Sequence, residues 1–311
     1  MAQRLRLLLD CDPGHDDAIA LLLAAHAPGA QLEAITTVAG NAPVVMTARN
    51  ALRVCTLAGI RDTPVAAGMD RPLVRALQTA EQIHGASGLI GADLPEPQIS
   101  LAPQHAVDLL IERLLSATNG LTLVATGPLT NVATAIRREP RILPHIQRIV
   151  LMGGAIGLGN WTPAAEFNIA TDPEAASIVF NCGQPITMVG LDVTHQALAT
   201  AEVRERIRAL RSPVATFVDD LLGYYAERYA NIYGFPAPPV HDACAVAVAL
   251  DPSLLQSQLM RVDIELRGEF TAGRTVCDRY GVTGRLPNAE VGLSLDVPRF
   301  WDLLIGVLAT Y

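Results

Sequence analysis

The sequence predicts an α/β fold in which helices cover both faces of an open, mostly parallel sheet. Two observations carry this prediction: short β-type runs alternate with helical patterns along the chain, and the runs are apolar throughout rather than at every second residue. Strands that are buried on both faces have this pattern. A third observation, the lack of any Pro/Ser-rich linker or low-complexity tract in the 311 residues, predicts one domain, 1–311.

The elements follow from local patterns in chain order. The first strand, 6–9, leads into a helix at 16–27, where apolar residues recur at near-helical spacing. Segment 68–103 is rich in Gly and Pro and is predicted to be irregular, and segment 201–250 is mostly helical. We expect further strands at 33–38, 64–67, 121–125, 148–152, 185–189, 260–266 and 290–295, and further helices at 46–57, 104–116, 129–137 and 172–180.

Charge excludes several classes of function. The net charge of −8 is spread along the chain, whereas nucleic-acid and anionic-membrane binding need a cationic face. All 23 basic residues are arginine, so a Schiff-base lysine, a pyridoxal-phosphate lysine and a Walker lysine are excluded. No uncharged apolar run approaches the roughly 20 residues that a membrane helix needs.

Cysteine usage and the start of the chain predict a cytoplasmic protein. The five cysteines are odd in number, far apart and without a C-x-x-C pair, which favours free thiols in a reducing compartment. The first apolar stretch stops at Asp10 and is too short for a signal peptide. With 50% hydrophobic and only 17% charged residues, the composition also hints at contacts between copies of the chain.

Four aspartates follow the first predicted strand within eight residues, Asp10, Asp12, Asp16 and Asp17 in LLLDCDPGHDD. Carboxylates this crowded repel one another by about 1 to 4 kcal/mol per close pair, and the Pro-Gly bend between them brings them together. A hard cation relieves that repulsion, and oxygen ligands of short reach favour Ca²⁺ or Mg²⁺ over zinc. Helix capping and the helix dipole explain two of the four aspartates, not all.

Polar residues also follow the other predicted strands. They are Gly40-Asn41, Thr126-Gly127, Gly153-Gly154 and Gly190-Leu191-Asp192. The carboxyl ends of parallel strands lie at one edge of the sheet, and ligands of open α/β sheets bind there. These segments, distant in sequence, are therefore predicted to converge with the aspartates on one crevice.

At this point the residues carry a resemblance. The stretch LLLDCDPGHDDAIALLLA is similar to the N-terminal D-x-D-x-x-x-D-D signature of the inosine-uridine-preferring nucleoside hydrolases. The similarity continues through VAGN, IHGASGL, ATGPLTN, MGGAIGLGNWTPAAEFNIATDPEAA and VHDACA, in the expected order and over nearly the whole chain. Within the family the chain looks most like the bacterial pyrimidine-preferring ribonucleoside hydrolases.

The resemblance implies Ca²⁺-dependent hydrolysis of the N-glycosidic bond of ribonucleosides. By match to the family pattern, the ligands of the calcium are Asp12, Asp17, the backbone carbonyl of Thr126 and Asp242, and Asp12 is also the general base for the calcium-bound water. The ribose hydroxyls would be held by Asp16, Asn41, Asn160, Glu166 and Asn168, with Asp242 sharing that task, and Asp10 would support the other aspartates by hydrogen bonding. Such a site rejects 2′-deoxynucleosides, because its buried polar groups lose their partners.

The base side is predicted with alternatives. By the same resemblance His241 is a candidate acid for the leaving base or a histidine that orients the ligand loop, and His84 is a base contact on a flexible lid or a structural residue. Tyr225 and Tyr229 lie four apart on one helix face, where they close over the base or pack. Met152 either lines the ribose floor or completes a buried strand.

Other functions stay open beside this one. A broad or purine-preferring (inosine) nucleoside hydrolase is the nearest alternative. A Mg²⁺-dependent phosphohydrolase of the haloacid dehalogenase type would use Asp10 as its nucleophile, but its motif lacks the Pro-Gly pair that follows here. The last alternative is a non-catalytic protein that binds nucleosides or calcium. The resemblance further implies a homotetramer or a homodimer and a role in pyrimidine salvage.

Overall fold

The computed structural model describes residues 4–311, so residues 1–3 of the predicted domain lie outside it. One nine-stranded sheet runs through the molecule in the order β3-β2-β1-β4-β5-β6-β9-β7-β8. The first seven strands in that order are parallel, and β7 and β8 are added antiparallel at the end. The strands are β1 (Leu5–Cys11), β2 (Ala30–Thr37), β3 (Val65–Ala67), β4 (Leu121–Ala125), β5 (Ile146–Met152), β6 (Ile186–Val189), β7 (Leu255–Ile264), β8 (Thr275–Asp278) and β9 (Ala289–Leu295).

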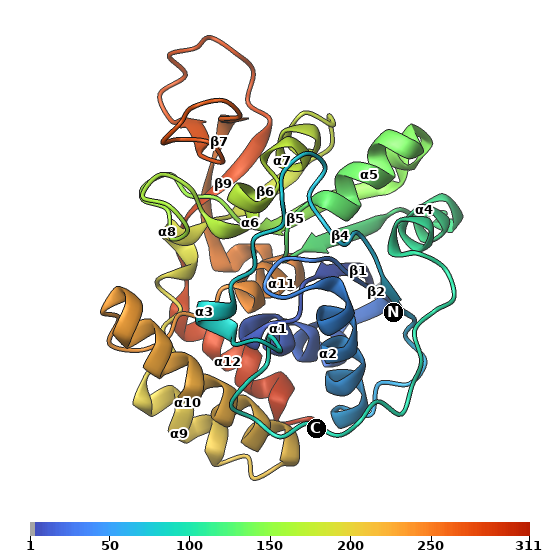
Figure 1. Cartoon of the computed structure of the whole chain (residues 1–311), viewed down its shortest axis with the longest axis vertical. Helices are drawn as coiled ribbons and strands as arrows, with labels where there is room; N and C mark the ends of the chain where they lie inside the picture. Colours follow the sequence, from blue (N-terminus) through green and yellow to red (C-terminus); the bar gives the residue numbers. More distant parts are fainter. Residues whose placement is uncertain (1–3) are drawn as a thin grey trace.

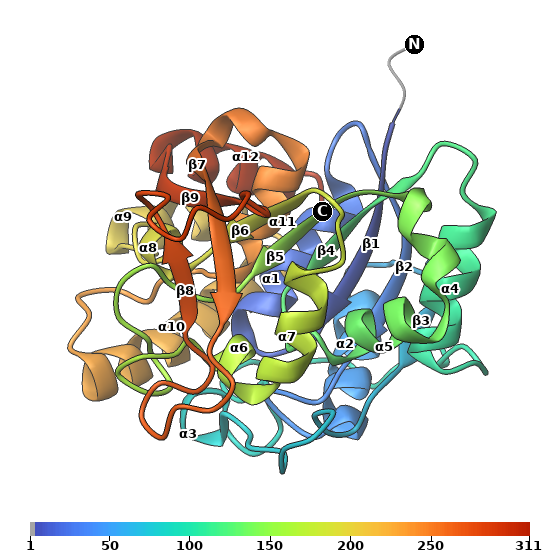
Figure 2. The ribbon, with the colours of Figure 1, turned by 90° about the horizontal axis from the view of Figure 1, so that it is seen from above.

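Helices cover both faces of the sheet (Figures 1 and 2). One face carries α1 (His15–His26), α2 (Val44–Leu57), α11 (Asp242–Leu250) and α12 (Val297–Leu308), and their apolar side chains share one buried cluster with α9 (Ala201–Arg208) and α10 (Pro213–Tyr233). The other face carries α4 (Ala106–Ser116), α5 (Thr130–Arg138) and α7 (Pro173–Phe180), which form a second cluster. The remaining short helices are α3 (Glu81–His84), α6 (Phe167–Thr171), α8 (Leu191–Thr194) and the 3-10 turns 140–145 and 252–254.

The predicted fold class is confirmed, and so is the alternation of strands and helices as far as β6. The differences concern short elements. Segment 68–103 contains the one-turn helix α3, the strand expected at 260–266 begins earlier, at Leu255, and the edge strand β8 was not predicted. A four-residue edge strand takes its conformation from its pairing with β7 and has too few residues for a periodic signal.

The edge formed by the carboxyl ends of the parallel strands positions the site. Asp12 follows β1, Asn41 lies beyond β2, Thr126 follows β4, and Gly153 follows β5. The segment that contains Asp16 and Asp17 begins α1, which packs directly against α11 on the same face of the sheet. Because α11 begins at Asp242, that packing brings a residue from late in the chain to the N-terminal aspartates. Within residues 4–311, no helix is both long and apolar enough to span a membrane.

Candidate active site

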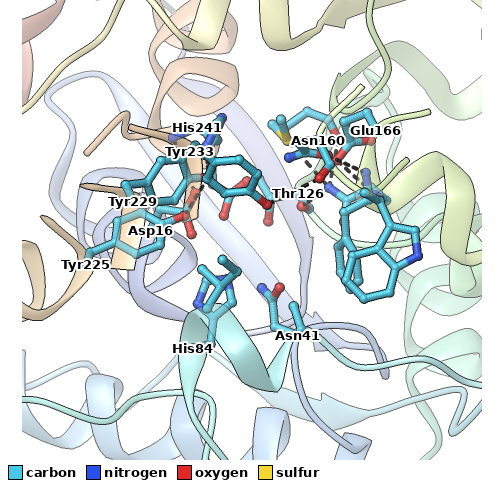
Figure 3. A pocket seen from close by; sticks show the side chains of 17 residues that line it. Asp16, Asn41, His84, Thr126, Asn160, Glu166, Tyr225, Tyr229, Tyr233 and His241 are labelled. Carbon is cyan, nitrogen blue, oxygen red and sulfur yellow. Dashed lines mark hydrogen bonds between the residues drawn. The ribbon is translucent and has the colours of Figure 1, made fainter. Parts of the chain in front are cut away.

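A pocket opens at the predicted edge of the sheet (Figure 3). Figure 3 shows two sides: Asn160, Glu166 and Thr126 face Tyr225, Tyr229 and His241 across the pocket, and His84 and Asn41 lie between them. Of the residues that the sequence singled out, the pocket is lined by Asp16, Asn41, His84, Thr126, Met152, Asn160, Glu166, Asn168, Tyr225, Tyr229, His241 and Asp242. Asp10, Asp12 and Asp17 do not line it; they are fully buried behind its aspartate side.

The pocket has Asp16, Asn41, Thr126 and Asp242 on one side, with the buried Asp10, Asp12 and Asp17 behind them. We call this group, which includes the whole aspartate loop 10–17, the floor. Asp17 accepts four hydrogen bonds: Oδ1 from the Asp12 amide (3.2 Å) and the Thr126 hydroxyl (2.9 Å), and Oδ2 from the Gly14 amide (3.1 Å) and the Asn41 side chain (3.0 Å). Asp17 therefore fixes the shape of the loop. These donors come from three separate segments, so the floor is built as one unit.

Asp12 lies in the tightest part of the floor. Its Oδ2 accepts a hydrogen bond from the Asn41 amide at 2.7 Å, whereas its Oδ1 has no partner within residues 4–311. A Cβ atom at Gly40 would lie 2.1 Å from Oδ2, and one at Gly127 would lie 2.6 Å from Oδ1. Both positions therefore need glycine, because the backbone approaches the carboxylate too closely for any side chain.

The floor suits a hard cation. Asp16, Asp17 and Asp242 each present a carboxylate oxygen, and the three atoms lie within 4.8 Å of one another. Burial and the neighbouring carboxylates raise the pKa of Asp12 and Asp242 well above the usual range, and they raise the pKa of Asp16 to about 7. Crowded, desolvated carboxylates with an unpartnered oxygen on Asp12 are the donor set that Ca²⁺ or Mg²⁺ needs.

The structure places Asp16 in a cluster of carboxylates with two of the predicted cation ligands, Asp17 and Asp242. The resemblance assigns Asp16 to ribose and Asp12 to the cation, whereas the closest cluster of oxygens joins Asp16 to Asp17 and Asp242. Asp16 also accepts a hydrogen bond from the His241 amide at 3.3 Å. Asp16 lines the pocket and belongs to the carboxylate cluster, so its position is compatible with a contact to ribose or to a cation.

Asp10 braces the floor from inside β1. Its Oδ1 accepts hydrogen bonds from the Thr36 hydroxyl at 2.6 Å and from the Asn131 side chain at 2.8 Å. Asn131 also donates to the Thr37 carbonyl, at 3.0 Å, and so joins β1 to β2 and α5. Asn131 is the last residue of the ATGPLTN segment, but its contact to Asp10 could not be read from the sequence. Burial raises the pKa of Asp10 to about 7.

The wall opposite the tyrosines is built at the start of α6. Glu166 accepts hydrogen bonds from the Gly154 amide (2.9 Å) and the Asn168 amide (2.8 Å), and burial raises its pKa to about 7. The Asn168 side chain donates to the Thr126 carbonyl (2.7 Å) and to the Met152 carbonyl (3.1 Å). Asn160 accepts from the Phe167 amide (2.9 Å). These bonds fix the polar side chains that face the pocket.

The aromatic wall, which we define as His84, Tyr225, Tyr229, Tyr233 and His241, closes the other side. The Tyr229 hydroxyl lies 2.7 Å from Nε2 of His241. On the other side of the His241 ring, Nδ1 lies 2.7 Å from the hydroxyl of buried Thr194. Burial lowers the pKa of His241 well below its usual range, which favours the neutral ring. One ring nitrogen of the neutral form then donates to its hydroxyl partner, and the other accepts.

His84 completes the aromatic wall and depends on a residue that the sequence did not single out. Its Nδ1 lies 3.0 Å from Nδ1 of His15 and 3.2 Å from the backbone nitrogen of His15. Burial lowers the pKa of His84 well below its usual range. Gly85, Gly88 and Gly91 after it all have positive φ, a backbone conformation that glycine adopts without strain. The flexible lid stays a prediction.

Several residues of the pocket were missed by the sequence reasoning. Phe167 and Ile83 line it, and Trp161 lines it with an edge contact to Phe167. The Trp161 indole also donates to Gln78 at 3.2 Å, which joins the 156–166 loop to the 70–80 segment. A hydrophobic residue in a loop has no periodic signal that separates a pocket lining from ordinary packing, and only the family-like segment GLGNWTPAAEFN pointed to this loop.

Comparisons with known proteins identify the family of this chain. Residues 7–302 match the family described as inosine-uridine preferring nucleoside hydrolase. A pyrimidine-specific ribonucleoside hydrolase RihA from Shewanella baltica (strain OS185) is 50% identical over 306 residues, covering 98% of this chain and 96% of that protein. The protein of the same description from Escherichia coli (strain K12) is 49% identical over 310 residues, covering 99% of each.

Solved structures give the same result for the fold. A purine-preferring ribonucleoside hydrolase from Gardnerella vaginalis superposes with a TM-score of 0.92 at 33% identity, covering 98% of each chain. An inosine-uridine preferring nucleoside hydrolase from Bacillus anthracis has a TM-score of 0.83 at 22% identity, covering 99% of this chain and all of that one, which bears on the fold alone.

Proposed function

Because the chain belongs to the inosine-uridine preferring nucleoside hydrolase family, we propose that it hydrolyses pyrimidine ribonucleosides, cytidine and uridine, to ribose and the free base. One observation carries the choice of base: the relatives described as pyrimidine-specific are similar over the full length at about half identity. The purine-preferring structure shares the fold at lower identity, so the fold alone does not select the base.

The proposed cation is Ca²⁺, held by Asp12, Asp17, the Thr126 carbonyl and Asp242, with Asp16 beside them. The support is the all-oxygen donor set, the unpartnered Asp12 Oδ1 and the raised pKa of Asp12 and Asp242. When bound, the ion supplies positive charge that offsets the repulsion of the carboxylates and lowers the pKa of a water molecule at the floor.

Asp12 is the proposed general base. Its Oδ1 accepts the proton of the attacking water, while the Asn41 amide holds its Oδ2 in place at 2.7 Å. Departure of the base leaves an oxocarbenium-like ribosyl group, which the carboxylates of the floor stabilise electrostatically. Glu166, Asn168 and Asn160 line the wall of the pocket opposite the tyrosines, and their proposed role is to hold the ribose hydroxyls.

Tyr229 and His241 are the proposed groups that assist the leaving base. If the Thr194 hydroxyl donates to His241 Nδ1, the ring hydrogen lies on Nε2 and donates to the Tyr229 oxygen. The Tyr229 hydroxyl hydrogen is then free to point into the pocket, where it stabilises negative charge on the departing base. The lowered pKa of His241 favours this neutral arrangement over an imidazolium acid.

Initial rates on uridine, cytidine, inosine and adenosine, measured side by side with Ca²⁺, test the proposal. We expect uridine and cytidine to be hydrolysed well ahead of the purine nucleosides, and inosine ahead of uridine would overturn the pyrimidine preference. With 2′-deoxyuridine the rate should fall by about 100-fold or more, because the groups that hold the 2′-hydroxyl lose their partner. Turnover of a phosphate ester instead of nucleosides would favour the phosphohydrolase alternative.

Location and assembly are proposed as well. A cytoplasmic location is supported by the five cysteines, all of them free. A homodimer or homotetramer is supported by large apolar side chains that are exposed in the single chain, among them Phe270, Tyr280, Val282 and Leu286 near the β7–β8 edge of the sheet. Sedimentation velocity of the full-length protein measures the assembly directly, and a single monomer peak would contradict it.

A further inference from the structure

His15 has an unusual place in the site. It is the first residue of α1, between Gly14 and Asp16, and therefore belongs to the aspartate loop. Its side chain is buried but does not line the pocket. It reaches instead behind the aromatic wall, away from the carboxylates on either side of it in the sequence.

The His15 ring contacts three segments that are distant in sequence. Its Nε2 lies 2.7 Å from the Ile90 carbonyl, and its Nδ1 lies 3.0 Å from His84 Nδ1. The ring is also parallel to Tyr224 and Tyr225 of α10, with interplanar angles of 6° and 2° and centroid distances of 5.1 and 5.3 Å. One side chain thus joins the aspartate loop to α3, to the loop after it and to α10.

The loop after α3 is packed closely against the same helix. Gly91 has φ +106°, and a Cβ atom there would lie 2.5 Å from Cβ of Tyr224. A second tie comes from Asn50, whose side chain donates to the Pro13 carbonyl at 3.0 Å and to the Ser87 carbonyl at 2.7 Å. The aspartate loop and the 85–91 loop are therefore held together at two points, of which only His15 also contacts the aromatic wall.

An ordinary buried residue could fill this space but could not make these contacts. The Ile90 carbonyl can only accept a hydrogen bond, so it needs the N–H that His15 presents at Nε2. Nδ1 of His15 can then only accept, so Nδ1 of His84 donates to it, and this contact sets the orientation of His84, which faces the pocket. A flat ring is required as well, because both tyrosines stack on it.

We propose that His15 is a positioning residue that sets the place of the aromatic wall relative to the catalytic aspartates. It acts through His84 and Tyr225 and thereby affects the binding and departure of the nucleobase. It touches neither substrate nor cation. The inference rests on the proposed function, in which the aromatic wall is the base side of the site. It predicts that the effect of losing His15 depends on the leaving group.

The experiment compares two substrates that share ribose and differ in the leaving group. Uridine needs the aromatic wall to hold its base, whereas the p-nitrophenolate of p-nitrophenyl β-D-ribofuranoside leaves without assistance. His15→Phe keeps the ring and removes both polar contacts. We expect kcat/KM for uridine to fall by about 10- to 100-fold, the scale of a misplaced catalytic group, and kcat/KM for the p-nitrophenyl riboside to change by less than about threefold.

Matched variants separate positioning from a general loss of structure. His26→Phe changes the last residue of the same helix, whose ring stacks on Tyr311 away from the pocket, and should leave both substrates at wild-type rates. His15→Gln can still donate to the Ile90 carbonyl and should recover part of the uridine activity. Tyr224→Leu removes one stacked ring without altering the pocket lining, and should give the same selective loss, smaller in size.

The outcomes are distinct. A selective loss on uridine in His15→Phe and Tyr224→Leu supports the proposal. An equal loss on both substrates in His15→Phe overturns the proposal, because the effect then lies in the aspartate loop. A uridine rate in His15→Phe equal to that of His26→Phe also overturns it. Should His15→Phe fail to fold, equal loss on both substrates in Tyr224→Leu decides against the proposal. A wild-type enzyme that hydrolyses neither substrate would overturn the proposed function itself.

Discussion

The floor and the aromatic wall of the pocket are built in different ways. The carboxylates of the floor come from the aspartate loop after β1 and from the start of α11. Backbone amides and short side chains hold those of the aspartate loop by hydrogen bonds of 2.6–3.3 Å. The aromatic wall consists of rings from α3, α10 and the start of α11, and much of its order comes from ring packing. The floor is thus fixed by the sheet, whereas the wall is fixed by contacts between helices and loops.

The two regions also respond to pH in opposite directions. Burial raises the pKa of the floor carboxylates, to about 7 for Asp10 and Asp16, and lowers the pKa of the histidines at the wall, to about 4 for His15 behind it. Both shifts favour the neutral form of a desolvated group. As the pH rises above about 7, the floor therefore gains negative charge that a cation would offset. The wall stays neutral, as suits contact with the uncharged base of the proposed substrate.

Asp12→Asn is expected to have the largest effect, and it acts on the floor alone. The new side-chain amide keeps an oxygen for the Asn41 backbone N–H but cannot take a proton, so kcat for uridine should fall by about 1,000-fold or more. Asp62→Asn, at an exposed position, should change nothing. The same change removes a buried charge, so without added metal the melting temperature at pH 8 should rise by about 2–5 °C. A variant that loses stability and keeps its activity would contradict both roles.

Tyr229→Phe tests the aromatic wall with the next largest effect. The ring stays in place, but the hydroxyl that lies 2.7 Å from His241 Nε2 is lost. We expect kcat for uridine to fall by about 10- to 100-fold and the p-nitrophenyl riboside to be hydrolysed at nearly the wild-type rate. In contrast, Asp12→Asn should abolish both reactions. A Tyr229→Phe variant that lost both reactions equally would remove the distinction between floor and wall.

The same contrast explains which parts could be predicted from the sequence. Asp10, Asp12, Asp16 and Asp17 lie close together in the chain and follow an apolar strand, so the motif and the topology of a parallel sheet suffice to bring them to one edge. Most residues supplied by the sheet edge and by family-like segments lie at the pocket or directly behind it. Asp192 is the exception: it does not line the pocket, and its carboxylate accepts hydrogen bonds from the Ile156 and Gly157 amides. Their individual roles stay predictions.

His15 shows what could not be predicted. It lies inside the most recognisable motif of the chain, yet its partners are at positions 84, 90, 224 and 225, in segments whose approach depends on tertiary packing. Thr194 and Asn131 are similar cases, since each acts through a single hydrogen bond to a site residue far away in sequence. No local spacing encodes such contacts, and β8 was missed for the same reason.

Asp10→Asn tests the pH response of the floor through the stability of the protein. The folded state binds the Asp10 proton more tightly than the unfolded chain, so the wild type loses stability as the pH rises from about 4 to about 7. The amide of the variant keeps the bonds from Thr36 and Asn131 to its oxygen and does not titrate. Without metal, the variant and the wild type should have the same melting temperature at pH 4. At pH 8 the variant's melting temperature should be about 5 °C higher.

His15, behind the aromatic wall, should show the opposite trend. The unfolded chain binds a proton at His15 more tightly than the folded state, so lowering the pH from about 6.5 to about 4 costs stability. This loss should remain in Asp10→Asn, measured by thermal unfolding in calcium-free buffers.

Added Ca²⁺ should raise the wild-type melting temperature more at pH 8 than at pH 5, because it competes with protons for the floor carboxylates. Equal stabilisation at both values would contradict a carboxylate site.

Thr194→Val should have the smallest effect, and it tests which nitrogen of His241 carries the ring hydrogen. Valine fills the same buried space but removes the hydroxyl that lies 2.7 Å from His241 Nδ1. The ring hydrogen can then move to Nδ1, Nε2 becomes an acceptor, and the Tyr229 hydroxyl turns toward His241 instead of the base. Because one neutral hydrogen bond is at stake, kcat for uridine should fall by about 3- to 10-fold.

Thr194→Ser keeps the hydroxyl and serves as the matched control, with near wild-type turnover. The p-nitrophenyl riboside should be indifferent to both changes, since its leaving group needs no hydrogen from Tyr229. A loss on both substrates in Thr194→Val would mean that Thr194 supports the floor through Asp242, the residue next to His241. The floor and the aromatic wall would then be less independent than their separate contacts suggest, because the Thr194 hydroxyl would affect both of them.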